Sequence, residues 1–248
     1  MEFLHSEAYR VGSYQCNKER KLKLESILNF TQDALESYGQ NCIMGIDVCR
    51  KNNLTWVIRN NDVSIYNLPT WSDQIVVDTR LEQMHRSILV VSSDAYMKNR
   101  RKHIFSSISH LVLMDLTCMR PAVAKDKIPH LLDLVQESKE KPVFIPIPAP
   151  VRLDSELNKP VRWDYIDFNQ HVNNASYVVF ARQTLPTSFY EENQLTRVRA
   201  AYKAPAVLGD TMLIQTQKED TQTLHRIVSK SNPAVEYARI QMDWRVRE

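Results

Sequence analysis

The chain has 248 residues, of which 43% are hydrophobic and 25% charged, and its formal net charge is +3 at pH 7. This composition is that of a globular protein with a substantial core, and it excludes disordered and fibrous classes. The charge is too small and too diffuse to predict nucleic-acid binding, although local basic clusters can still meet an acidic partner.

The amino terminus and the cysteines set the expected compartment. Residues 1–7 contain no basic segment followed by an apolar one, so no signal peptide is predicted, and their early acidic residues argue against a transit peptide. No apolar run approaches the ~20 residues that a membrane helix needs. The cysteines, Cys16, Cys42, Cys49 and Cys118, lack metal-ligand spacing. We therefore expect a soluble cytoplasmic protein with reduced thiols, no membrane insertion, no metal and no cofactor.

Apolar spacing in the first half of the chain predicts one helix and then strands. The helix is expected over residues 22–38, with Gly39 as its C-cap. Strand-like runs follow it over four ranges, which are 55–66, 74–83, 87–93 and 104–116. The charged stretch 94–103 between the last two is expected to form a hairpin loop.

The second half repeats this order. A helix is predicted over 174–184, because Pro186 cannot continue it. Strand-like runs follow over four ranges, which are 196–203, 211–217, 224–229 and 235–246. Even the entry to the sheet is similar, since Tyr66-Asn67-Leu68-Pro69 precedes Asp73 and Tyr202-Lys203-Ala204-Pro205 precedes Asp210. The shared order indicates an internal duplication.

A linker separates the two halves. Residues 128–136 are compatible with a short helix, and 141–150 are rich in proline, which favours a stiff, extended segment. We therefore predict an α+β protein with domains over 1–125 and 151–248 and a linker over 126–150. In each domain a long helix would be wrapped by a curved antiparallel sheet, as in hot-dog domains, and the two sheets would pair side by side.

One segment before the second helix combines three chemically useful side chains. Asp167, Asn169 and His171 alternate, so in an extended stretch they would project to one side. A carboxylate or imidazole can act as a general base, and backbone N–H groups opening the helix near Asn173 and Asn174 can polarise a carbonyl. The alternative is structural: the asparagines as simple helix caps and the histidine as an ordinary surface or core residue.

The wider motif, Asp167-x-Asn169-x-His171-Val172-Asn173-Asn174-x-x-Tyr177, resembles the active-site motif of plant and bacterial acyl-acyl carrier protein thioesterases. The first half resembles the same family at four places, which are Trp56-Val57-Ile58, Pro69-x-Trp71-x-Asp73, Leu113-Met114-Asp115 and Arg120-Pro121. The resemblance runs from about Phe3 to Asp243. It implies two tandem hot-dog domains, an acyl-chain tunnel mostly in the first, and catalytic roles in the second for Asp167, Asn169 and His171.

The chain departs from the family at one point. Plant members have a Glu-Cys pair where this sequence has Pro205 and Ala206, so a cysteine nucleophile is excluded here. Asp167 is then the main candidate for the general base or nucleophile, with Asp164 and Asp210 as lesser ones. Cys16-Asn17 takes the place of Asp167 in the first repeat, so one complete site per chain is expected.

The expected activity is hydrolysis of fatty acyl thioesters of acyl carrier protein. Basic clusters at residues 18–23 and at Arg100, Arg101 and Lys102 would dock this acidic partner, unless they are simply solvated turns. Two alternatives remain open, which are an acyl-CoA thioesterase and a non-catalytic acyl-binding or regulatory protein. The oligomeric state is also open, with a homodimer as one option.

Overall fold

The computed structural model describes residues 4–40, 45–135 and 137–247. Phe3, Cys42 and Gln136, which figure in the predictions above, lie outside the described residues. The chain forms two compact units, Met1–Phe144 and Ile145–Glu248, and the division falls within the range 126–150. Each unit is described by itself, and the side-by-side pairing of their sheets stays a prediction.

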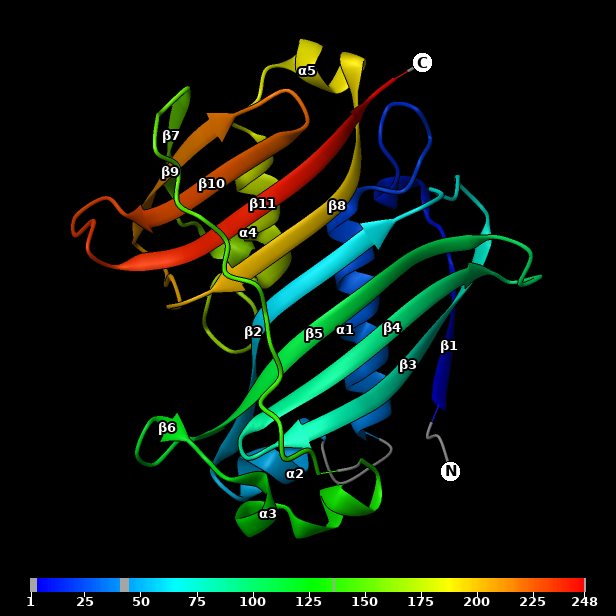
Figure 1. Cartoon of the computed structure of the whole chain (residues 1–248), viewed down its shortest axis with the longest axis vertical. Helices are drawn as coiled ribbons and strands as arrows, with labels where there is room; N and C mark the ends of the chain where they lie inside the picture. Colours follow the sequence, from blue (N-terminus) through cyan, green and yellow to red (C-terminus); the bar gives the residue numbers. More distant parts are fainter. Residues whose placement is uncertain (1–3, 41–44, 136, 248) are drawn as a thin grey trace. The chain divides into compact units, whose positions relative to one another are not determined.

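The first unit is a long helix against an antiparallel sheet. Its helices are α1 (Leu24–Gln40), α2 (Ile46–Lys51) and α3 (Ala124–Lys127), with 3-10 turns at Ser13–Gln15 and Pro129–Asp133. Its strands are β1 (Leu4–Arg10), β2 (Leu54–Ile65), β3 (Gln74–His85), β4 (Ile88–Met97), β5 (His103–Asp115) and β6 (Arg120–Pro121). The strand order is β1-β3-β4-β5-β2, with β6 paired to β5, and α1 lies along one face (Figure 1).

The core of this unit lies between α1 and the sheet. Ile75 and Val77 of β3 alternate inward and are fully buried, as are Ile27 and Ala34 on the apolar side of α1. Burying each such side chain contributes about 1.5–3 kcal/mol, which is why the helix needs the sheet to be stable. The predicted helix and four strands of this half are therefore confirmed.

The end of α1 corrects one prediction. Gly39 does not cap the helix, because α1 continues to Gln40 and Gly39 is a buried residue of its last turn. A C-cap glycine would need a positive φ, and Gly39 has none. Close packing at this end of the helix requires a glycine at position 45, since a Cβ on Gly45 would lie 2.8 Å from the Gly39 carbonyl oxygen.

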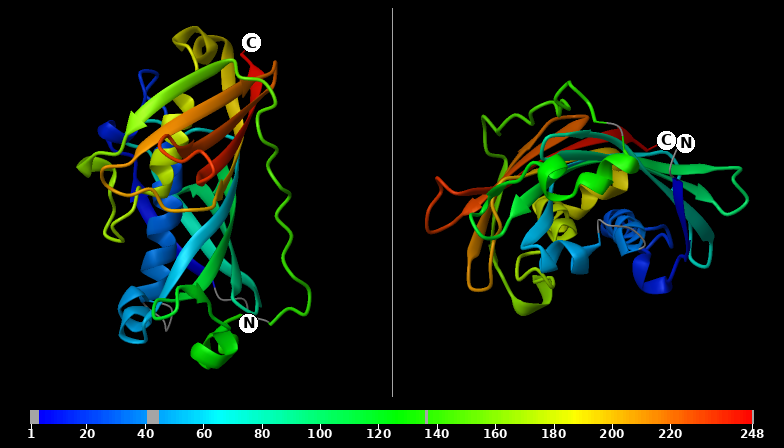
Figure 2. Two further views of the ribbon diagram at one scale, coloured as in Figure 1. Left: turned by 90° about the vertical axis from the view of Figure 1, so that its left-hand side faces the viewer. Right: turned by 90° about the horizontal axis from the view of Figure 1, so that it is seen from below.

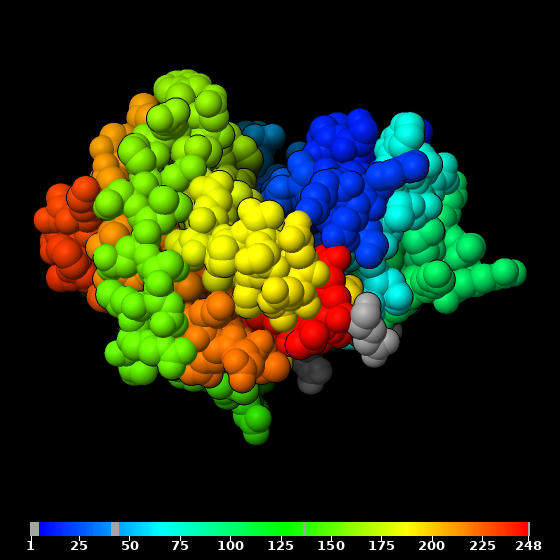
Figure 3. All heavy atoms as spheres, turned by 90° about the horizontal axis from the view of Figure 1, so that it is seen from above, coloured from blue at the N-terminus to red at the C-terminus, as the bar shows by residue number. Residues whose placement is uncertain are grey.

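The second unit repeats the architecture on a smaller scale. Its helices are α4 (Asn174–Arg182) and α5 (Thr187–Glu192), with a 3-10 turn at Trp163–Tyr165. Its strands are β7 (Ser155–Pro160), β8 (Asn193–Tyr202), β9 (Thr211–Lys218), β10 (Gln222–Ser229) and β11 (Glu236–Val246). The antiparallel order is β8-β11-β10-β9-β7. The edge strand β7 alternates exposed and half-buried residues, and the yellow-green segment that contains it is visible at the surface in Figure 3.

The duplication extends to individual hydrogen bonds, and these correct the sequence match by one residue. The N–H groups of Tyr66 and Asn67 both donate to one carbonyl, and in the second unit the pair that does so is Lys203 and Ala204. Tyr66 therefore corresponds to Lys203, not to Tyr202. The same pattern makes Pro69 the counterpart of Ala206 and Asp73 the counterpart of Asp210.

Residues 141–150 are extended and outside regular secondary structure. In the second unit their carbonyls are held by arginines that point away from the core: Arg199 of β8 donates to Ile145, and Arg239 of β11 donates to Ile147 at 3.0 Å. Residues 145–150, which belong to this unit, run along the face of its sheet opposite α4 (Figure 2). The helix expected over 128–136 is replaced by the 3-10 turn after α3. Within the described residues, none of the helices is both long and apolar enough to cross a membrane.

Candidate functional site

The segment from Asp167 to His171 is a tight turn, not the extended stretch that we expected. Ile166 and Val172 form an antiparallel bridge, and between them Asp167 N–H donates to the His171 carbonyl at 2.8 Å. Gln170 N–H donates to the Asp167 carbonyl at 3.0 Å, and Gln170 has a φ of 65°. The argument that three alternating side chains share one face therefore fails, and any common position must come from the turn itself.

The Asp167 carboxylate is half-buried and is used by the turn only in part. One oxygen, Oδ1, accepts the Asn169 N–H at 2.8 Å. Among the described residues Oδ2 has no hydrogen-bond partner, and the same holds for the exposed side chains of Asn169 and His171. One carboxylate oxygen, an amide and an imidazole are thus free to meet a ligand.

Helix α4 begins directly after this turn and uses most of its first N–H groups internally. Asn173 is the N-cap, and its side-chain oxygen accepts the Ala175 N–H at 2.8 Å. The Ser176 N–H donates to the Asn173 carbonyl at 2.9 Å. The capping interpretation is therefore correct for Asn173. The Asn174 N–H has no partner within the described residues, so it remains a donor at the positive end of the helix.

The first unit builds the same turn with different side chains. Asn17 N–H donates to the Lys21 carbonyl at 2.8 Å, and the Asn17 side-chain oxygen accepts the Glu19 and Lys21 N–H groups at 2.9 and 3.0 Å. Arg20 has a φ of 63°, as Gln170 has 65°. The turn is therefore part of the repeated scaffold. What differs is the chemistry: Asn17, Glu19 and Lys21 stand where the second unit has Asp167, Asn169 and His171.

The loop 203–210 closes the site on its other side. Asp210 Oδ2 accepts the Val207 N–H at 2.9 Å and the Tyr237 hydroxyl at 3.0 Å, so this lesser candidate is engaged in holding the loop. The buried residue Ala206 accepts the Val172 N–H at 2.9 Å and donates its own N–H to the Tyr177 hydroxyl at 3.0 Å.

Tyr177 is a site residue to which the sequence assigned no role, although it closes the motif. Its ring is buried, and this burial raises the pKa of its phenol. The Ala206 hydrogen bond lowers the pKa by less, and Tyr237, Asp210 and Asp167 raise it slightly further, so the phenol is neutral. Sequence spacing places Tyr177 one helical turn past Asn173, but only the fold shows that it reaches the backbone at Ala206.

The three basic residues predicted to dock a partner have different environments. Arg100 forms an ion pair with Asp78, donates to it at 3.1 Å through a second nitrogen, and lies 5.5 Å from the Tyr96 ring. Burial of Asp78 would raise its pKa, but hydrogen bonds from Arg100 and Ser6 outweigh it and lower the pKa. Arg100 is therefore structural. Arg101 and Lys102 are exposed at the tip of the β4–β5 turn.

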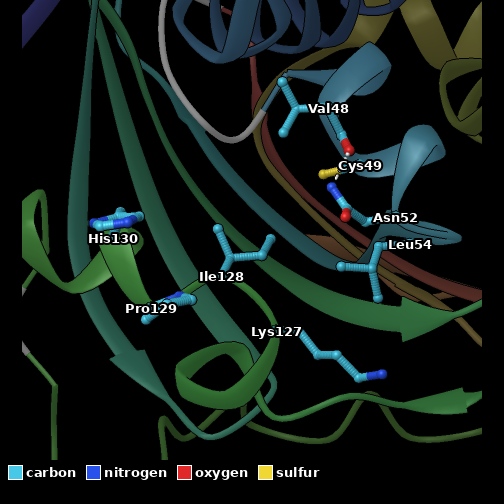
Figure 4. Close-up of a pocket in the computed structure, with 8 residues that line it drawn as sticks. All are labelled: Val48, Cys49, Asn52, Leu54, Lys127, Ile128, Pro129 and His130. Carbon is cyan, nitrogen blue, oxygen red and sulfur yellow. Dashed lines mark hydrogen bonds between the residues drawn. The ribbon is translucent and has the colours of Figure 1, made fainter.

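A pocket of about 160 Å³ lies in the first unit, and none of its lining residues belongs to the motif. Val48 and Cys49 of α2, its C-cap Asn52, and Leu54 of β2 form one wall, and residues 127–130 form the other (Figure 4). It adjoins a buried apolar cluster that includes Cys49, Leu54 and Ile128. Its lining is mostly apolar, which suits hydrocarbon better than a polar ligand.

Comparisons with known proteins agree on one family. The family model of the acyl-ACP thioesterase N-terminal domain matches residues 2–132, and that of the C-terminal domain matches residues 149–246. An acyl-[acyl-carrier-protein] hydrolase of Cuphea viscosissima is 20% identical over 96% of this chain. The chain spans only about three fifths of the length of such relatives, 62% in this case.

Two solved structures share the fold over nearly the whole chain. A putative oleoyl thioesterase from Lactobacillus plantarum matches with a TM-score of 0.85 at 20% identity, covering 100% of this chain and 98% of its own. An acyl-ACP thioesterase from Bacteroides thetaiotaomicron gives 0.84 at 18% identity, covering 98% of each chain. With both family models placed in order on two hot-dog domains, the chain belongs to the acyl-ACP thioesterase family.

Proposed function

We propose that this chain hydrolyses fatty acyl thioesters of acyl carrier protein, releasing a free fatty acid and the carrier thiol. One observation carries the proposal. Within the described residues, the turn before α4 holds a carboxylate with one oxygen that has no partner, and α4 opens directly after it on an N–H without a partner, on a scaffold that the first unit builds with an amide instead. Membership of the family supplies the reaction class.

Asp167 acts as the essential carboxylate, either as a general base on water or directly as a nucleophile. As a base, it takes the proton of a water molecule whose oxygen bonds to the thioester carbonyl carbon. The developing oxyanion is stabilised by the Asn174 N–H at the start of α4. The carbon–sulfur bond then breaks, and the departing thiolate takes a proton. Asn169 and His171, whose side chains have no partner among the described residues, position the thioester or the water.

The first unit holds the acyl chain in this proposal. It has Asn17 in the place of Asp167, while its pocket and the adjoining cluster are apolar. Each buried CH₂ adds about 0.8 kcal/mol, so the length of this space would select chain length. The exposed Arg101 and Lys102 would meet the acidic carrier protein, and Arg100 is left out of this role because it is paired with Asp78.

The test is Asp167→Asn with Asn17→Asp as its matched control. Asn17 shows that an asparagine makes the same turn bond, so Asp167→Asn should fold normally and lose only the charge. We expect kcat to fall by roughly a hundredfold or more, the scale of lost acid–base catalysis. Asn17→Asp, which adds a carboxylate to the other turn, should leave the rate unchanged. Wild-type turnover by folded Asp167→Asn would reject the assignment.

The donor is decided by a separate assay. Purified protein is given a panel of acyl-carrier-protein and acyl-CoA thioesters, and the released thiol is measured. Faster turnover of the carrier-bound substrates supports the proposal, and a preference for CoA would move the chain to the acyl-CoA alternative. Binding without turnover of either donor would indicate an acyl-binding protein.

A further inference from the structure

Tyr177 connects α4 to the turn that carries Asp167. Its hydroxyl oxygen accepts the Ala206 N–H at 3.0 Å, and the Ala206 carbonyl accepts the Val172 N–H at 2.9 Å at the end of the turn. Ala206 is fully buried and Tyr177 is 3% exposed, so water cannot replace the phenol as the acceptor. A buried N–H left unpaired is costly. The contact of α4 with the loop at Ala206 and the turn at Val172, called the joint below, therefore depends on the hydroxyl.

The first unit makes the same joint without a hydroxyl. There Leu22 N–H donates at 2.9 Å to the carbonyl of Pro69, which has no N–H to satisfy. Ile27, the fourth residue of α1, stands where Tyr177 is the fourth residue of α4. An isoleucine and a proline thus meet every structural need of this joint. Of the two units, the phenol and its N–H partner occur in the one whose turn begins with Asp167, whereas the other turn begins with Asn17.

The phenol keeps one function that the joint does not use. Because its oxygen accepts from Ala206, its O–H hydrogen is still available to donate. Asp210 already accepts two hydrogen bonds on one oxygen, whereas Oδ2 of Asp167 has no partner among the described residues. The Asp167 charge also acts on the phenol, together with Asp210 and Tyr237.

We propose that Tyr177 is a positioning residue for Asp167: the Ala206 N–H orients the phenol, and the phenol O–H donates to the free oxygen of the Asp167 carboxylate when the acyl thioester occupies the site. This inference rests on the proposed function. Catalytic hydrogen bonds commonly tighten only in the substrate complex, so the lack of this bond among the described residues of the free chain is compatible with it. The bond aims the carboxylate and keeps it ionised.

The proposal predicts a change in the pH profile. The titratable groups around the Tyr177 phenol are Tyr237 on β11, Asp210 on the loop and Asp167, and Asp164 and His171 lie on the same segment as Asp167. Tyr177 itself supplies the neutral donor that favours the ionised carboxylate. Removing its hydroxyl should shift the acid limb of kcat, which reports the substrate complex, upward by about one pH unit, the scale of one hydrogen bond to a charged group.

Three variants separate this role from a structural one. Tyr177→Phe leaves the Ala206 N–H unpaired and removes the donor, whereas Tyr177→Phe with Ala206→Pro also removes the unpaired N–H, copying the joint of the first unit. Tyr190→Phe is the control, since it deletes a phenol bound to the Arg182 carbonyl at the other end of α4. Melting temperature, kcat, KM and the acid limb are measured for each with an acyl-carrier-protein thioester.

We expect Tyr177→Phe to lower the melting temperature, to reduce kcat about tenfold with KM within twofold, and to shift the acid limb. The double variant should recover the melting temperature but neither kcat nor the limb, and Tyr190→Phe should leave both unchanged. If the acid limb of the pH profile does not move in Tyr177→Phe, or if the double variant recovers its full kcat, the inference is wrong. The proposed function still stands in that case, provided that Asp167→Asn is inactive. An active Asp167→Asn instead rejects the proposed function and this inference together.

Discussion

His225 on β10 is fully buried, and this predicts a defined loss of stability in acid. The Trp244 indole donates to Thr223 at 3.1 Å, and Thr223 lies 2.9 Å from His225 Nε2. On the other side Nδ1 lies 2.8 Å from Thr216, which lies 2.7 Å from Thr184, whose hydroxyl also donates to a carbonyl of α4. Each threonine has one O–H to donate, so Thr216 donates to Thr184 and must accept from Nδ1, while Thr223 accepts from Trp244 and donates to Nε2. The ring therefore carries its single proton on Nδ1, and Nε2 accepts. The imidazole is therefore neutral.

The energetic size of the effect follows from the pKa. Burial lowers the pKa of His225 from its usual 6.5 to about 3. The unfolded chain binds a proton below pH 6.5 and the folded chain does not, so stability is complete above this pH and falls as the pH drops toward the folded pKa. Between pH 6.5 and pH 5 the loss is about 2 kcal/mol, at 1.36 kcal/mol for each pH unit. A chain of this size should then melt about 4–8 °C lower.

The assay compares the pH dependence of the melting temperature, from pH 7.5 to pH 5, in the wild type and in His225→Gln. Glutamine offers a donor and an acceptor to the two threonines but does not titrate, so the variant starts less stable and should lose less on acidification. His130→Gln serves as the control, because that imidazole side chain is 79% exposed. Parallel losses in the wild type and in His225→Gln would refute the reasoning.

Two further predictions concern the surface turn and the helix start. Arg101→Glu with Lys102→Glu should leave the melting temperature unchanged and raise KM for the carrier-bound substrate at low salt, with a smaller effect at high salt. Arg100→Ala should instead lower the melting temperature by several degrees, because it leaves the buried Asp78 without its ion pair; equal melting temperatures for both changes would contradict this. Asn173→Ala removes the N-cap of α4, so urea unfolding should show a loss of about 1 kcal/mol. An unchanged urea midpoint would show that the cap contributes nothing.

Local patterns in the sequence determined the main elements of both halves. In the helix before Gly39 and in the strands after it, the apolar residues recur with the period of the element, because one face must leave water. This period can be recognised from neighbouring residues alone. The edge strands were missed. β1 pairs with β3 from Leu4 opposite Arg80, and β7 exposes every second residue, so neither has a strong apolar pattern of its own. α2 and α5 are too short for a clear period.

The site was predicted in its residues but not in its geometry. The motif identified Asp167, whereas the tight turn around it depends on hydrogen bonds to Val172 and Ala206, the latter far along the chain. Tertiary contacts also decided that Arg100 pairs with Asp78, that Tyr177 reaches Ala206, and that His225 is buried neutral. The physical reason is common to all of these. Periodicity reports which face of an element avoids water, but the partner of a polar group is chosen by chain segments that only folding brings together.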